Sequence, residues 1–213
     1  MMDWESLRDT ALHCTACKLC QGRHHVVFGV GNPKAEIMFI GEGPGQHEDE
    51  QGEPFVGRSG QLMDKMLHYI DLDRSRNIYI ANIVKCRPKG NRTPNIAEAD
   101  FCAQRWLEKE LEILQPKVIV ALGSVALHYL GSPDMRITRD RGKWFKTRQG
   151  YDCIATYHPA YLLRLADPHV LNHAKWEVFY DLEAARKKAE EAVPDYKFMS
   201  EEKTDLFKLF KKR

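Results

Sequence analysis

The sequence has no long hydrophobic run, no excess of charge of one sign and no apolar segment at its start. A membrane-spanning helix needs about 20 consecutive apolar residues, and no run in this chain approaches that length. Residues 1–10 are charged and lack the apolar core of a secretory signal. We therefore expect a cytoplasmic protein that has no contact with a membrane.

The charges nearly cancel, with 32 Lys and Arg against 30 Asp and Glu and a net charge of +2 at pH 7. A nucleic-acid partner would therefore have to meet a local basic patch. Internal repeats are absent, and only the Lys- and Glu-rich C-terminal end is compositionally biased. With 213 residues, 43% of them hydrophobic, the chain can bury a proper core. We predict a monomer with one domain over residues 1–193 and a tail or final helix over 194–213.

The chain has six cysteines, which in a cytoplasmic protein are more often metal ligands than disulfides. Cys14 and Cys17 have a spacing that zinc and iron–sulfur sites share. Cys86 and Cys102 could complete a four-thiolate site that ties the N-terminus to the middle of the chain, or they could be small buried hydrophobic residues. Cys20 continues the pattern of a ferredoxin run, but the fourth cysteine and the proline of that run are missing.

Hydrophobic periodicity predicts strands that alternate with helices. The predicted strands are 37–40, 77–84, 117–122 and 154–157, and the predicted helices are 3–13, 61–70, one that starts at 94–95, 123–130 and 173–192. Asn95, with Glu98 three residues later, is typical of a helix start. Residues 131–151 are expected to form a connection or a small hairpin, and Cys153 to be a core residue. This alternation predicts an α/β fold with a mainly parallel sheet that helices cover on both faces.

A segment rich in glycine and carboxylates, residues 41–57, follows the predicted strand 37–40 directly. Open α/β sheets bind ligands outside the carboxyl ends of their strands, and Gly43 and Gly45 allow the backbone to approach a ligand closely. The alternative is a turn-rich surface loop. Long irregular loops are usually functional or disordered, and the apolar pair at Phe55 and Val56 argues against disorder. The segment is therefore predicted to be part of a binding site.

The loops after two other predicted strands carry groups suited to recognising a base. Asn82 offers an acceptor and donors together, as the edge of a nucleobase requires, and His158 can donate to an oxygen on which negative charge develops. Each signal has an ordinary alternative, since Asn82 could cap a turn and His158 could be a core histidine with its hydrogen bonds satisfied. The loop after Asn82 is locally basic, as phosphate contacts require, through Lys85, Arg87, Lys89 and Arg92.

In this order, the motifs resemble those of a family 4 uracil-DNA glycosylase, the iron–sulfur branch of the uracil-DNA glycosylase superfamily. The resemblance covers about residues 12–182 and rests on the motifs at 41–57, 82–88 and 158–160 together with the cysteines Cys14, Cys17, Cys86 and Cys102. It implies a three-layer α/β/α sandwich with a central, mainly parallel sheet of about four strands. It also implies a [4Fe-4S] cluster on those four cysteines and the removal of uracil from deaminated DNA, single- or double-stranded.

The same resemblance implies roles for the residues of the pocket. Uracil inside a duplex has to be flipped into the enzyme before it can be cleaved. Phe55 would then stack on the flipped ring, Asn82 would read its amide-like edge, and His158 would donate to the ring oxygen that becomes negative as the glycosidic bond breaks. A cytosine would present a donor where uracil presents an acceptor, which a polar site rejects strongly.

The remaining roles concern the attacking water and the DNA around the flipped nucleotide. The best-studied branch of the superfamily places an activating Asp where this chain has Gly43, so Glu42 is predicted to position the water. Glu48 is predicted to shape the pocket against the methyl group of thymine. The predicted DNA contacts comprise basic side chains for phosphates and leucines for the space left by the flipped base: Lys85, Arg87, Arg92, Leu162, Leu163 and Arg164.

Two rival functions are weighed. One branch of the superfamily traps its product covalently through a His in the loop after the second strand. Residues 85–94 contain no His, so we do not expect this chain to trap its product. The chain could also be a non-catalytic iron–sulfur or zinc protein that binds DNA or carries electrons on the same fold.

In the tail, residues 205–207 (Asp-Leu-Phe) resemble the end of the peptide with which bacterial repair proteins dock on the sliding clamp, although an amphipathic end folded back on the domain is the alternative.

Overall fold

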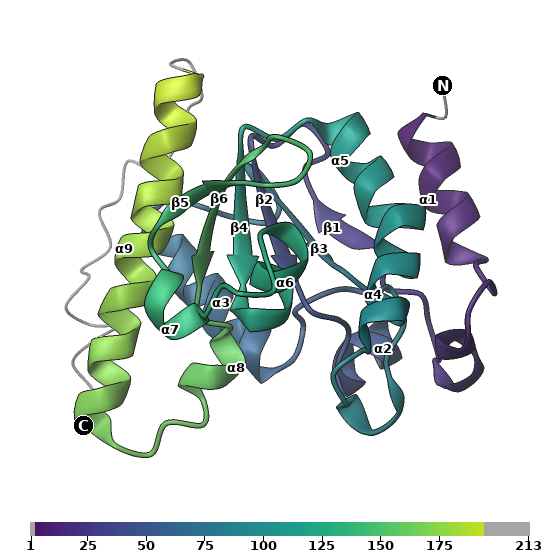
Figure 1. Cartoon of the computed structure of the whole chain (residues 1–213), viewed down its shortest axis with the longest axis horizontal. Helices are drawn as coiled ribbons and strands as arrows, with labels where there is room; N and C mark the ends of the chain where they lie inside the picture. The colour runs from purple at the N-terminus through teal and green to yellow at the C-terminus, as the bar shows by residue number, and fades with distance from the viewer. Residues whose placement is uncertain (1–2, 194–213) are drawn as a thin grey trace.

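The computed structural model of the chain describes residues 3–193. Its centre is one sheet with the strand order β1-β3-β2-β4-β6-β5 (Figure 1). The strands are β1 (Gly29–Gly31), β2 (Ile37–Gly41), β3 (Ile78–Asn82), β4 (Val118–Leu122), β5 (Trp144–Lys146) and β6 (Asp152–Thr156). The strands β3, β2, β4 and β6 run parallel, whereas β1 and β5 pair antiparallel at the two edges. The carboxyl ends of the parallel strands therefore meet at one edge of the sheet.

Helices lie on both faces of this sheet (Figure 1). They are α1 (Trp4–Leu12), α2 (Gln46–Gln51), α3 (Arg58–His68), α4 (Ile96–Cys102), α5 (Glu108–Leu114), α6 (Gly123–Leu130), α7 (Ile137–Asp140), α8 (Pro159–Leu162) and α9 (Pro168–Ala192). Short 3₁₀ turns occupy Lys18–Gly22 and Lys89–Asn91, and a π-helical turn, Ala103–Leu107, joins α4 to α5.

Alternation along the strands divides the interior into two cores. In β2, Met38 and Ile40 belong to a core with α1, α4, α5 and α6, whereas Ile37 and Phe39 belong to a core with α3, α8 and α9. Successive strand residues point to opposite faces, so a strand that is apolar throughout has to be covered on both sides. The predicted three-layer α/β/α sandwich with a mainly parallel sheet is thus confirmed.

The sheet has more strands than the four expected. The edge strand β1 is a Gly-Val-Gly segment without apolar alternation, and β5 lies within residues 131–151, where it pairs antiparallel with β6. Helix α2 forms inside the segment predicted as a loop, and α9 begins at Pro168 rather than at His173. Cys153 is fully buried, as predicted. The predicted helix start at Asn95 is confirmed by a capping box with Glu98.

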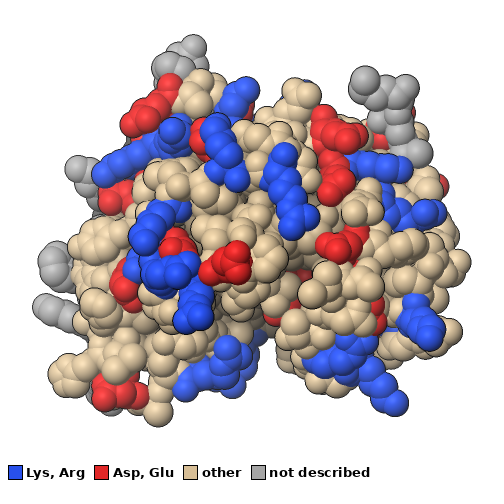
Figure 2. Space-filling view, viewed as in Figure 1, with Lys and Arg blue, Asp and Glu red and all other residues tan. Residues whose placement is uncertain are grey.

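Positive and negative side chains mix over the visible face of the molecule, in keeping with the small net charge (Figure 2). Among residues 3–193, none of the helices combines the length and the apolarity needed to cross a bilayer. The predicted tail at 194–213, with its clamp-like Asp-Leu-Phe, lies outside the described residues.

Candidate active site

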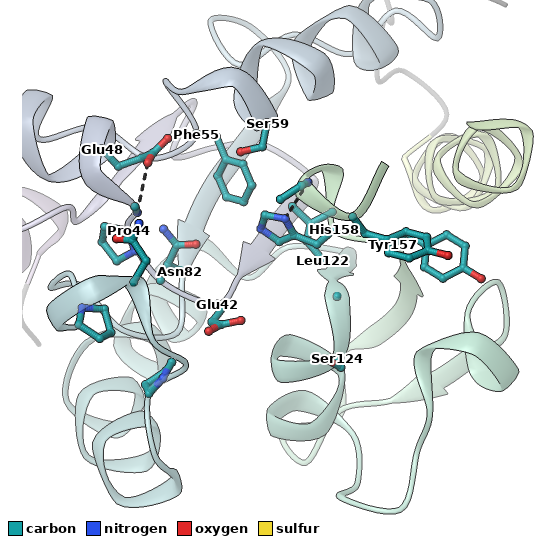
Figure 3. A pocket seen from close by; sticks show the side chains of 18 of the residues that line it. Glu42, Pro44, Glu48, Phe55, Ser59, Asn82, Leu122, Ser124, Tyr157 and His158 are labelled. Carbon is teal, nitrogen blue, oxygen red and sulfur yellow. Dashed lines mark hydrogen bonds between the residues drawn. The ribbon is translucent and has the colours of Figure 1, made fainter. Parts of the chain in front are cut away.

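A cleft of about 480 Å³ opens at the carboxyl ends of the parallel strands. Its walls come from the segments after β2, β3, β4 and β6, and Lys and Arg side chains flank its mouth on both sides (Figure 2). Glu42, Phe55, Asn82 and His158 surround a common space in this cleft (Figure 3). The structure thereby brings together predicted site residues that the sequence separates by more than a hundred positions.

The carboxylate of Glu48 organises the segment that follows β2. It accepts hydrogen bonds from the backbone N–H groups of Gly45 (3.1 Å), Val56 (3.0 Å) and Gly57 (2.8 Å). Three donors on one carboxylate close the segment around α2, which ends at Gly52 in the left-handed region (φ 77°). Glu48 lines the cleft, but its hydrogen bonds go to the backbone of the segment that builds the wall.

Phe55 is held in an uncommon backbone conformation, with φ at 55°. A positive φ is costly for a bulky residue and persists only where the surroundings enforce it. Arg74 donates to the carbonyl oxygens of Pro54 (3.0 Å) and Phe55 (2.9 Å), and a Cβ on Gly60 would lie only 1.7 Å from the Phe55 carbonyl oxygen. The Phe55 ring lies stacked near that of His158, with centroids 5.5 Å apart and planes at 30°.

Asn82 ends β3 and is 1% exposed, yet its Oδ1 atom has no hydrogen-bond partner among the described residues. A buried amide oxygen without a partner is unfavourable unless a ligand or water completes it. The site leaves room for nothing larger than glycine at Gly41, where a Cβ would lie 2.5 Å from this oxygen and 2.7 Å from the Phe55 ring. Asn82 lines the cleft, and its Oδ1 atom can accept a hydrogen bond from a ligand or water there.

His158 follows β6 and caps α8. Its Nδ1 atom accepts a hydrogen bond from the backbone N–H of Ala160 (3.1 Å). Burial and, to a smaller extent, the positive charge of Arg164 lower the pKa of this imidazole to about 4, against an opposing effect of Glu48. The ring is therefore neutral at pH 7, and because Nδ1 is an acceptor, the proton lies on Nε2. His158 can thus donate a hydrogen bond from Nε2.

Glu42 is the carboxylate nearest the end of β2 and is half-buried in the cleft. Burial raises the pKa of this group, and a hydrogen bond with Thr93 opposes the shift. Its backbone is fixed, because the Glu42 carbonyl accepts from the N–H of Val84 (3.2 Å). A Cβ on the neighbouring Gly43 would lie 2.6 Å from Cγ2 of Val84, so the chain passes close to β3 here.

Two of the predicted DNA contacts are wrong. Lys85 is 1% exposed, and its Nζ atom lies 2.5 Å from Glu110 Oε2 and 2.8 Å from the Phe28 carbonyl oxygen. Its ammonium group is paired inside the core and cannot reach a phosphate. Leu162 is also 1% exposed and packs in the core, whereas Leu163 is 42% exposed.

The other predicted contacts are exposed, except Arg87, which is half-buried. Arg164 is exposed and borders the cleft. Arg92 is exposed and forms hydrogen bonds of 2.7 and 2.8 Å with Glu98, and Arg87 donates to Asn91 Oδ1 (2.6 Å).

The sequence analysis missed several residues of the cleft. Gly123 and Ser124 begin α6 directly after β4, and Tyr157 and Tyr161 flank His158, with ring centroids 4.7 Å apart. The rule that located the other loops, a position just after a parallel strand, would have found Gly123 and Ser124 as well.

Five cysteines, Cys14, Cys17, Cys20, Cys86 and Cys102, line a second, small cavity. Arg23 Nη1 lies 3.2 Å from Cys86 Sγ, and the Lys85 backbone N–H lies 3.4 Å from Cys102 Sγ. Burial raises the pKa of the Cys86 thiol to about 11 and that of Cys102 to about 12. Within residues 3–193, no three His, Cys, Asp or Glu side chains are arranged as a site for a single metal ion. The four predicted ligands nevertheless gather around one cavity.

Comparison with known proteins yields consistent matches. The family model described as Uracil DNA glycosylase superfamily matches residues 28–183. A type-4 uracil-DNA glycosylase from Thermotoga maritima is 41% identical over 183 residues, which cover 85% of this chain and 92% of the relative. Type-4 enzymes from Sulfurisphaera tokodaii and Archaeoglobus fulgidus are also 41% identical, over 73% and 75% of this chain and 74% and 84% of their own lengths.

Proposed function

Because this chain belongs to the type-4 uracil-DNA glycosylases of the uracil DNA glycosylase superfamily, we propose that it hydrolyses the N-glycosidic bond of deoxyuridine in DNA. The products are free uracil and an abasic site. One observation carries the proposal: an amide oxygen on Asn82 that has no hydrogen-bond partner in the described part of the chain, an aromatic ring on Phe55 and a neutral donor on His158 meet in one cleft (Figure 3).

Asn82 recognises uracil through both halves of its amide. Oδ1 accepts from the N3–H of the base, and Nδ2 donates to the O4 oxygen. Cytosine has an acceptor at N3 and an amino donor at C4, so both contacts are reversed. A site with buried polar groups rejects such a mismatch by about 10⁴-fold, because its own groups are left unpaired. Phe55 adds a stacking surface for the flipped ring.

His158 stabilises the leaving group. As the glycosidic bond breaks, its electron pair moves onto uracil, and negative charge gathers on the O2 oxygen. The Nε2–H of His158 donates to this oxygen, and the Ala160 N–H fixes the ring in the required orientation. A donor that is already oriented needs no reorganisation during the reaction, which is why removing one typically costs about 10²–10³ in rate.

Glu42 positions the water that attacks C1′ of the sugar. The carboxylate accepts a proton as the new C–O bond forms, so it has to be ionised before the reaction. Gly43 lets the backbone approach the base closely at this point. Glu48 acts on thymine indirectly, through the wall of residues 55–57 that it holds in place.

The DNA flanking the flipped nucleotide lies over the mouth of the cleft. Arg87, Arg92 and Arg164 contact phosphates, which positions the strand without reading its sequence. Leu163 is the exposed side chain that fills the gap left in the stack. The proposal also includes a monomeric state and a tail that either docks on a sliding clamp or folds back on the domain.

The proposal includes a [4Fe-4S] cluster on Cys14, Cys17, Cys86 and Cys102. These four cysteines surround one cavity and would supply the four thiolates that hold such a cluster. When bound, it supplies a cross-link between the N-terminal segment and the segments after β3 and in α4. Metal binding also accounts for two thiols whose burial disfavours ionisation, because the metal takes the place of the proton. Cys20 lines the same cavity and has no assigned role.

The deciding experiment is uracil release from a labelled single-stranded oligonucleotide that contains one deoxyuridine. Matched oligonucleotides with thymine or cytosine at the same position serve as controls. We expect release from the uracil strand alone, and loss of release in His158→Ala. If iron-loaded protein that binds DNA releases no uracil, the chain is instead a non-catalytic DNA-binding or redox protein on this fold.

A further inference from the structure

Helix α2 carries two adjacent buried carboxylates that face different parts of the molecule. Glu48 holds the wall of the cleft, whereas Asp49 faces residues 23–25, which follow the cysteine-rich N-terminal segment. The other acidic residue of this helix, Glu50, is exposed to solvent. The two buried carboxylates therefore join the helix to two separate structures.

Asp49 is bound tightly to residues 24 and 25. Its Oδ1 atom accepts hydrogen bonds from the backbone N–H groups of His24 (2.9 Å) and His25 (3.3 Å). The Nδ1 atom of His25 lies 2.8 Å from the Asp49 carbonyl oxygen, to which it donates. The second carboxylate oxygen lies 3.7 Å from Nδ1 of His24. One buried carboxylate thus accepts hydrogen bonds from two consecutive backbone N–H groups.

Residues 23–25 are connected with the cysteine cavity through Arg23. This residue lines that cavity, and its guanidinium lies 3.2 Å from Cys86 Sγ. On the other side of α2, the carboxylate of Glu48 accepts from Val56 and Gly57, which directly follow Phe55. A continuous set of contacts therefore runs from the cysteines through Arg23, His24 and His25 to α2, and from there to the aromatic wall of the cleft.

We propose that Asp49 is a positioning residue that couples the metal-bound N-terminal segment to the uracil pocket. The references to uracil and to the bound metal both rest on the proposed function. Bound metal holds residues 23–25 in place, these residues anchor α2 through Asp49, and the anchored helix places Glu48 under the 55–57 wall. Loss of the metal and loss of the Asp49 carboxylate should therefore both make residues 55–57 more mobile.

Amide hydrogen exchange tests this coupling without reference to catalysis. The N–H groups of Val56 and Gly57 are protected by Glu48, so exchange in a peptide that covers residues 53–58 reports on the wall. In Asp49→Ala we expect exchange there to rise about 10-fold or more, with the iron content of the wild type retained. Asp49→Asn keeps an oxygen acceptor and should restore most of the protection. Glu50→Ala, the matched control on the same helix, should change nothing.

Metal removal by chelation provides the second arm. In the wild type it should raise exchange at 53–58, whereas in Asp49→Ala it should add little, because the link is already broken. Unchanged exchange at 53–58 after metal removal from the wild type would overturn the coupling, even if Asp49→Ala fails to fold. Additive effects of chelation and Asp49→Ala on exchange at 53–58 would also overturn the coupling. Wild-type protein that shows the coupling but releases no uracil would refute the proposed function alone.

Discussion

Lowering the pH from 8 to 5 tests the state of His158 in the free enzyme. Burial, and then the charge of Arg164, lowers the pKa of the imidazole to about 4. Protonation of Nδ1 would set it against the N–H of Ala160 and break the hydrogen bond that orients the ring. The neutral ring is therefore the active form, and it should persist through the pH range in which an ordinary histidine becomes charged.

At pH 5, the fraction of neutral His158 differs greatly between an ordinary pKa and the lowered pKa. A histidine with the ordinary pKa of about 6.5 would be neutral in only ~3% of molecules, and the rate would fall about 30-fold. With a pKa of about 4, roughly 90% of molecules keep the neutral ring at pH 5. The contribution of His158 to the rate should then change by only about 10% between pH 8 and pH 5.

The assay is single-turnover uracil release from a labelled single-stranded oligonucleotide, measured at subsaturating enzyme so that the profile reports the free enzyme. Glu42 introduces a second titration, since its carboxylate has to be ionised and burial raises its pKa. The wild-type rate should therefore fall as the pH drops through that raised pKa. Glu42→Gln removes this titration and lowers the rate at every pH, and the profile that remains should be flat down to pH 5.

A rate decrease centred near pH 6.5 in both the wild type and Glu42→Gln would refute the reasoning. It would mean that His158 titrates with the pKa of an ordinary histidine and that its surroundings do not favour the neutral ring. A rate that rises as the pH falls would also refute it, because the charged ring would then be the better donor. His158→Ala serves as the reference, with a loss of about 10²-fold in rate at pH 7 and little change in DNA affinity.

Four further outcomes are expected. Asn82→Asp presents no amide donor and should reduce the preference for uracil over cytosine by ~10²-fold or more in competition assays, so an unchanged preference would contradict its role in readout. Cys86→Ala should lose iron and sulfide in elemental analysis while Cys153→Ala retains both; one zinc without iron in the wild type would contradict the cluster. Leu163→Ala should slow excision from duplex DNA about 10-fold but leave single-stranded DNA unaffected, since only the duplex has a gap to fill. Deleting residues 203–213 should abolish clamp binding with excision from short oligonucleotides intact, whereas lower thermal stability, with no clamp binding by the full chain, would favour a folded-back tail.

The central strands and the loops of the site could be predicted from the sequence because both depend on local patterns. A strand covered on both faces is apolar throughout, so β2 and β4 are visible as short runs bounded by polar residues. Ligands bind where such strands end, so the sequence alone indicates Asn82 and His158 as site residues. The edge strand β1 has no such pattern, since three residues at a sheet edge need no apolar alternation.

Only the tertiary structure decided which polar and apolar side chains are buried. Lys85 lies in a basic loop sequence, but Glu110 and the Phe28 carbonyl, distant along the chain, hold it inside the core. Leu162 and Leu163 are chemically identical and adjacent, yet Leu162, the last residue of α8, packs in the core, whereas Leu163 faces solvent. Burial depends on what the rest of the chain places nearby, and no local pattern encodes that.

The chemistry of the cleft divides in the same way. The sequence by itself determined that an Asn and a His would lie at the carboxyl edge of a parallel sheet and that four cysteines could share a metal. The tertiary structure decided that the Asn82 oxygen has no hydrogen-bond partner within residues 3–193, that Ala160 selects the Nε2–H form of His158, and that Asp49 binds the backbone of His24 and His25. The Asp49 hydrogen bonds, of 2.9 and 3.3 Å, join residues 25 and 24 positions apart along the chain, and only the packed fold sets such distances.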